Sequence, residues 1–148
     1  MSPHPEGLKQ IKGLLFDKDG TLIDFNRSWL PPMKAAADLV ASHAGQPDMA
    51  ASLLIDGGYI PELDSWQKDS IIAYETSDAM LESWARLTSI ALIESLTPQI
   101  QKIVHDALYH AVPVVGDIKP LLSGMAERYV LGVASMDDEI NVKRTLTG

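Results

Sequence analysis

The hydrophobic positions along the chain predict two short strands separated by a long helical segment. Residues 11–16 (IKGLLF) form an apolar run that ends at an acidic turn containing Asp-Gly, through which a helix would not continue. Residues 129–134 (YVLGVA) form a second run of this kind. We therefore predict a buried strand at each of these two positions.

Helices are predicted between and after the strands because apolar positions recur at three- and four-residue steps. The first helix is predicted to be capped by Ser28, to carry Pro31 and Pro32 in its first turn, and to end at Gly45. Residues 59–68 contain proline and several polar residues, which predicts a loop. The predicted helices occupy residues 33–44, 47–55, 77–93, 97–111, 118–128 and 137–146.

Two carboxylates, Asp17 and Asp19, follow the first strand at once. Residues two apart in extended backbone point the same way, and the carboxyl end of a parallel strand is where α/β sheets place ligands. Two close anions repel each other unless a cation lies between them, and magnesium is the usual cation in phosphate chemistry. Gly20 lets the backbone approach a phosphate, and Thr21 supplies a hydroxyl.

The acidic turn has two other interpretations. An EF-hand calcium loop is excluded because the glycine stands at the fourth position instead of the sixth, and position twelve is Ser28 instead of Glu. A plain surface turn is the other interpretation, since Asp-Gly on its own is common.

Composition and charge narrow the classes of partner. The formal charge of -8 argues against nucleic acid and anionic membranes, which need clustered Lys and Arg. The absence of cysteine excludes disulfides, thiolate metal sites and cysteine nucleophiles. No apolar run approaches the roughly 18–20 residues that a membrane span needs, and the start lacks a secretory pattern. We expect a cytoplasmic protein with no nucleic-acid or membrane partner and a loose tail before Lys9.

Residues 14–22 (LLFDKDGTL) resemble the first motif of the haloacid dehalogenase (HAD) phosphatases, an apolar strand followed by Asp-x-Asp-Gly-Thr-Leu. The resemblance implies that Asp17 attacks the phosphoryl group and forms an aspartyl-phosphate. It implies that Asp19 protonates the leaving oxygen and then activates the hydrolytic water. It also implies that the Asp17 carboxylate and the Asp19 backbone carbonyl bind Mg²⁺, with Gly20 and Thr21 in contact with the phosphate.

Residues 129–135 are similar to the second HAD motif, an apolar strand that ends in Ser or Thr. This similarity implies that the Ser135 hydroxyl and the Met136 amide bind phosphoryl oxygens. The segment between the motifs resembles the helical cap of HAD enzymes, which closes over the site and selects the substrate. Three basic residues of this segment are candidates for contact with an anionic substrate or, taken singly, ordinary solvated charges: Arg27, Lys34 and Arg86.

The fold class that the resemblance implies is α/β, with a HAD-like Rossmannoid parallel-sheet core, here incomplete, and an inserted α-helical cap. The core would comprise residues 1–25 and 112–148, and the cap would comprise residues 26–111. We expect His43, His105 and His110 to be structural or surface residues. The acidic residues 137–139 are expected to serve the start of a helix, where the helix dipole favours negative charge.

Within the family, three segments are most similar to phosphoglycolate phosphatase-like hydrolases: residues 17–29, 57–59 and 83–85. The implied activity is the magnesium-dependent hydrolysis of small phosphorylated metabolites. The substrate itself is not readable from the cap, because cap residues carry no general code for specificity.

The chain departs from the family after its second motif. HAD enzymes carry, further along, a Lys that stabilises the phosphoryl charge and an acidic pair that completes the magnesium site. Neither is found at the expected place, since Lys143 and Arg144 come too early. The sequence is therefore interpreted as C-terminally truncated, and a sheet without its later strands would expose an edge that favours self-association.

Three alternatives stay open. The chain is part of a longer enzyme, or it is a short protein with a catalytically inactive HAD-like domain that acts through binding. In the third alternative it is a helical interaction module in which the match to the first motif is accidental.

Overall fold

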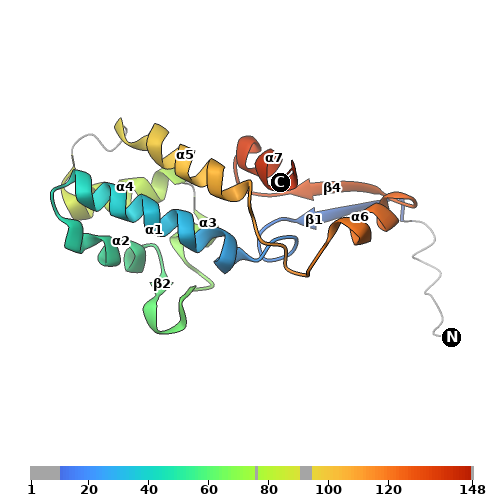
Figure 1. Cartoon of the computed structure of the whole chain (residues 1–148), viewed down its shortest axis with the longest axis horizontal. Coiled ribbons are helices and arrows are strands. Elements are labelled where there is room, and N and C mark those ends of the chain that lie inside the picture. Colours follow the sequence, from blue (N-terminus) through green and yellow to red (C-terminus); the bar gives the residue numbers. More distant parts are fainter. Residues whose placement is uncertain (1–10, 76, 91–94, 148) are drawn as a thin grey trace. The chain divides into compact units, whose positions relative to one another are not determined.

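The computed structural model describes residues 11–75, 77–90 and 95–147 (Figure 1). The predicted tail before Lys9 and the predicted helical turn at 91–93 lie outside these residues. The described part of the chain combines α-helices with a parallel two-stranded sheet, so the protein is of mixed α/β class. No helix in this part is long and apolar enough to cross a membrane.

Contacts between residues divide the chain into two compact units. The first unit consists of the chain up to Asp24 and of Val112–Ser135, and the second consists of Phe25–Ala111 and the chain from Met136 onward. The sequence prediction had placed all of residues 112–148 with the strands. In the structure the last segment instead makes its contacts with the helical unit.

The sheet of the first unit pairs β1 (Gly13–Asp17) with β4 (Val130–Ala134). The strands are parallel and their register places Asp17 beside Ala134, so both strands end at the same edge (Figure 1). A parallel pair needs a long crossover connection, and here most of the chain lies between the two strands. Both predicted strands are confirmed.

The prediction that these strands are buried is wrong, because no residue of either strand is fully buried. Helix α6 (Lys119–Ala126) packs against β4. A sheet of two strands has no further strands to cover the side chains of either one. On one face, the side chains of Leu15 and Val130 are 73% and 77% exposed. Gly132 lies opposite Leu15 in the register, and a Cβ there would come within 3.2 Å of the Leu15 Cδ1 atom.

The second unit is built around α1 (Phe25–His43), which packs against α2 (Ala50–Asp56), α4 (Ser77–Thr88) and α5 (Thr97–Leu108). Its hydrophobic core contains buried residues of each of these helices, with Trp84 completely buried among them. The shorter elements of this unit are η2 (Pro47–Met49), β2 (Tyr59–Ile60), η3 (Pro61–Leu63), β3 (Ser65–Trp66), α3 (Ile71–Tyr74) and α7 (Glu139–Thr147).

The boundaries of α1 and α4 differ from the prediction. Helix α1 begins at Phe25, so Pro31 and Pro32 lie inside it and not in its first turn. Two backbone N–H donors are missing there. Pro32 and its apolar neighbours on this face are buried, and that burial offsets the loss. Helix α4 ends at Thr88 because the next residue, Ser89, adopts a positive φ of 57°.

The predicted loop at 59–68 contains a small antiparallel hairpin formed by β2 and β3. Its strands pair Tyr59 with Trp66, and the two rings meet edge to face with centroids 5.8 Å apart. Ring packing between strands of this length cannot be read from residue periodicity, since neither strand exceeds two residues.

Candidate active site

The loop after β1 is organised around the backbone carbonyl of Lys18. This oxygen accepts hydrogen bonds from the N–H groups of Leu22 (2.9 Å) and Ile23 (3.1 Å). Gly20 adopts a φ of +79°, and its N–H donates to the Ile23 carbonyl at 2.8 Å. The positive φ, and not crowding, requires glycine here, because nothing lies within 4 Å of where a Cβ would be.

The far end of the loop is anchored to the segment that returns from the helical unit. The Asp24 N–H donates to the Val112 carbonyl at 2.7 Å, and the Val114 N–H donates to the Leu22 carbonyl at 3.1 Å. Leu22 and Ile23 are buried, with exposed fractions of 6% and 5%. The loop that carries the candidate acids is therefore held at both ends within the first unit.

Asp17 is the last residue of β1, and its side chain is exposed. The Thr21 hydroxyl donates to Asp17 Oδ2 at 3.3 Å, so the candidate nucleophile has a donor from its own loop. Asp17 pairs with Ala134 in the sheet, and Ser135 is the next residue of that chain segment. The structure thus brings Asp17 and Ser135 to neighbouring strand ends.

Asp19 is held by the residue that precedes it. The Lys18 Nζ atom lies 2.7 Å from Asp19 Oδ2, and the Lys18 side chain is completely buried while that of Asp19 is 23% exposed. Lys18 is not among the site residues predicted from the sequence. Its position between two aspartates after a strand is the signal that could have found it, because a lysine there has a carboxylate on either side with which to pair.

Met136 begins the segment that belongs to the second unit, and its side chain is 83% exposed. The acidic residues after it serve the start of α7, as expected. Asp138 Oδ1 accepts a hydrogen bond from the Asn141 N–H at 2.7 Å, which is the usual arrangement of a helix N-cap. Asp137 Oδ1 accepts another from the Asn141 side-chain amide at 2.7 Å.

The basic residues of the helical unit were candidates for substrate contact. Lys34 lies 2.9 Å from Asp64 Oδ1, and the Tyr59 hydroxyl donates to the same oxygen at 2.6 Å. Hydrogen bonds from Tyr59 and Lys34 lower the pKa of Asp64, and the hydrogen bond to Asp64 raises the pKa of Lys34. The Lys34 ammonium therefore pairs with the β2–β3 hairpin. Arg27 and Arg86 are exposed.

The donor atoms near Asp17 suit magnesium in kind. Mg²⁺ binds oxygen ligands, typically one or two carboxylates, and keeps several waters. The Asp17 carboxylate and the Asp19 carbonyl are ligands of this type at an exposed strand end. Among the residues that the structure describes, no three His, Cys, Asp or Glu side chains are grouped closely enough to hold a metal by themselves.

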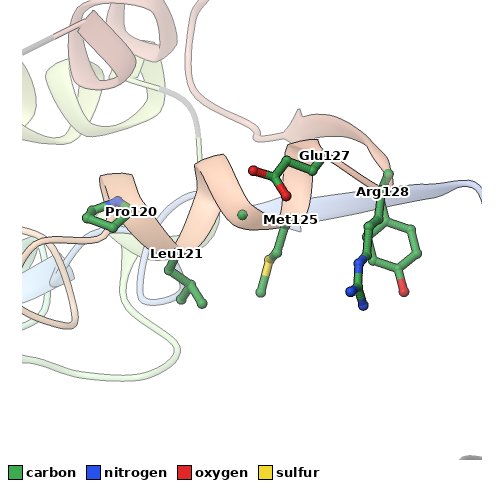
Figure 2. Close-up of a pocket in the computed structure, with 7 residues that line it drawn as sticks. Pro120, Leu121, Met125, Glu127 and Arg128 are labelled. Carbon is green, nitrogen blue, oxygen red and sulfur yellow. The ribbon is translucent and has the colours of Figure 1, made fainter.

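A shallow hollow of about 350 Å³ lies over α6 and the residues that follow it (Figure 2). It is lined by Pro120, Leu121, Gly124, Met125, Glu127, Arg128 and Tyr129. None of the predicted site residues lines this hollow, so it is separate from the acidic loop.

Comparison of the chain with protein-family models, curated proteins and solved structures found no match in any of the three.

Proposed function

We propose that the chain is a HAD-type, magnesium-dependent phosphomonoester hydrolase that acts on small phosphorylated metabolites of the phosphoglycolate kind. One observation carries the proposal: a parallel strand pair that ends in Asp17 on one strand and leads directly to Ser135 on the other. Ligands of α/β proteins bind at the carboxyl ends of parallel strands. A carboxylate and a hydroxyl at this edge suit nucleophilic attack on a phosphoryl group and the binding of its oxygens.

The chain's own residues then have distinct tasks. The Asp17 carboxylate attacks phosphorus and forms an aspartyl-phosphate as the bond to the leaving oxygen breaks. Asp19 takes up a proton as the substrate binds, gives it to that oxygen and later takes one from the water that hydrolyses the acyl phosphate. The hydroxyls of Thr21 and Ser135 and the amide of Met136 orient the phosphoryl oxygens. Magnesium, bound by the Asp17 carboxylate and the Asp19 carbonyl, would offset the charge of the phosphate.

The test is phosphate release from a panel of small phosphomonoesters, with and without Mg²⁺. We expect Asp17→Asn to abolish magnesium-dependent release, because an amide is not a nucleophile for this reaction. Asp38→Asn is the matched control, since Asp38 is an exposed aspartate on α1 and should leave release unchanged. Release that persists undiminished in a folded Asp17→Asn variant would rule out the proposed nucleophile.

A second candidate is an inactive HAD-like domain that acts by binding a second copy of itself. The exposure of Leu15 and Val130 on one face of the sheet favours it, because exposed apolar side chains on a strand pair invite association. Under this candidate Asp17→Asn changes neither folding nor association. A folded wild-type chain that releases no phosphate but dimerises would favour it over the hydrolase.

A further inference from the structure

The most unusual side chain of the first unit is Lys18, whose exposed fraction is zero. Lysine is rarely buried because transferring an ammonium out of water is costly unless an anion accompanies it. Asp19 Oδ2 is that anion, 2.7 Å from Lys18 Nζ. Asp19 keeps partial access to solvent, so the pair joins a fully buried ammonium to a partly exposed carboxylate.

Lys18 is restrained at both its backbone and its side chain. Its carbonyl oxygen accepts the hydrogen bonds of Leu22 and Ile23 that shape the loop, and its side chain is enclosed. An ammonium restrained in this way can hold the Asp19 carboxylate in one orientation. The Thr21 hydroxyl does the same for Asp17 at 3.3 Å. The Asp19 carboxylate therefore contacts a charged donor, whereas the Asp17 carboxylate contacts a neutral one.

The charge of the loop follows from this arrangement. Two carboxylates and one ammonium within three consecutive residues leave one net negative charge. Addition of a divalent cation makes the loop net positive, which favours a phosphate dianion. Without the ammonium, the loop would hold two net negative charges. It would then attract the cation more strongly and be left neutral when the phosphate arrives.

We propose that Lys18 is a positioning residue that acts through Asp19, and that its buried charge favours binding of the phosphoryl group over binding of magnesium alone. The inference rests on the proposed function, because it concerns the same site. It differs from a purely structural role for Lys18 in one measurable respect. A loss of structure weakens the binding of both Mg²⁺ and phosphate. A loss of the charge alone weakens the binding of phosphate and leaves the binding of Mg²⁺ equal or stronger.

The experiment uses the whole chain and the variant Lys18→Met, which removes the charge and keeps an unbranched side chain. Calorimetric titrations measure the Kd of Mg²⁺ alone and then the Kd of inorganic phosphate at saturating Mg²⁺. We expect phosphate binding to weaken about tenfold, the effect of one charge acting over several ångströms in a partly solvated site. The Kd of Mg²⁺ should stay equal or fall. Lys102→Met, which removes a lysine paired with Asp106 on the surface of α5, should change neither constant.

A second variant distinguishes the effect of the charge from an effect of misfolding. Lys18→Met combined with Asp19→Asn removes both charges of this ion pair, so neither is left without the other. Its loop again carries one net negative charge, so phosphate affinity should return to within a few-fold of wild type. Circular dichroism establishes that each variant is folded before it is titrated.

Three outcomes would overturn the inference while leaving the proposed function intact. In the first, folded Lys18→Met binds phosphate as tightly as the wild type. In the second, Lys18→Met weakens Mg²⁺ and phosphate binding together. In the third, the double variant binds phosphate about tenfold more weakly than the wild type. A wild-type chain that binds no phosphate in the presence of Mg²⁺ would instead overturn the proposed function, and the inference with it.

Discussion

Single residues in the loop after β1 decide how the two candidate acids are presented. The Thr21 hydroxyl contacts Asp17 and the Lys18 ammonium contacts Asp19, and both contacts come from within the same short loop. A neutral hydroxyl bond of this kind contributes about 1 kcal/mol, whereas removing one partner of a buried ion pair costs several times more. Substitution of Lys18 should therefore reduce stability and change ligand binding more than substitution of any other residue of this loop.

Gly20 offers a test of backbone conformation without the complication of crowding. Its φ is +79° and a Cβ would touch nothing within 4 Å, so Gly20→Ala should destabilise the protein by about 1–2 kcal/mol through the backbone alone. Gly124→Ala is the control in the same unit, because Gly124 lies in α6 with equally open space and should gain slightly from alanine's helix propensity. Chemical denaturation measures both. Equal effects of the two substitutions would contradict this explanation.

The β2–β3 hairpin is attached to α1 by charged and aromatic side chains. Lys34 of α1 pairs with Asp64 and lies 5.1 Å from the centre of the Tyr59 ring. Asp64 itself has a positive φ of 46° at the turn of the hairpin. An element with only four residues in strands depends on such contacts, because it has few ladder hydrogen bonds.

The pH dependence of this attachment follows from the lowered pKa of Asp64. Hydrogen bonds from Tyr59 and Lys34 favour the ionised carboxylate in the folded protein. The stabilisation is present above the ordinary pKa of 3.8 and is lost as the pH falls through the lower folded value. We expect Asp64→Asn to lower the Tm at pH 7 and the difference from wild type to shrink as the pH falls below 3.8. The side chains of Lys34 and Asp64 are 44% and 69% exposed, so the effect should be small.

The expected direction is specific to Asp64. Asp48→Asn, at the start of η2, is the control for the loss of one carboxylate elsewhere in the same unit. A Tm difference for Asp64→Asn that grows on acidification would contradict the stabilising role of the ionised carboxylate.

At the scale of the whole molecule, the two units differ in how much apolar surface they bury. The helical unit has a contiguous core of buried side chains from four helices. In the first unit, the fully buried hydrophobic residues among those described are Leu22 and Ile23, while Leu15 and Val130 are mostly exposed. Burial of the exposed Leu15 and Val130 side chains against another protein surface would be favourable, because it removes apolar surface from water.

The exposed strand face predicts self-association. Sedimentation velocity over a range of concentrations should show a dimer that Leu15→Glu weakens, because a carboxylate would be buried there without a partner. Leu63→Glu is the matched control, since Leu63 is 69% exposed in the other unit and gains the same charge. Equal effects of the two substitutions would assign any change to net charge, and a strictly monomeric wild type would exclude this surface as an interface between copies.

Much of the local structure could be predicted because it depends on neighbours in sequence. Both strands and the helices around residues 47–55 and 97–111 were expected, and each has its signal in a nearby proline, glycine or apolar repeat. The start of α1 was missed because packing of its buried face carries the helix through two prolines. The hairpin was missed because its strands are too short to show a period.

The candidate site divides in the same way. The sequence by itself determined that two aspartates, a glycine and a threonine follow a strand, and that a second strand leads into Ser135. The proposed HAD relationship and phosphatase activity stay predictions from that pattern. Only the tertiary structure decided that the two strands pair in parallel with Asp17 beside Ala134, that Lys18 is buried against Asp19, and that α7 contacts α5. These features arise from contacts between distant segments and from burial, which no local pattern of residues specifies.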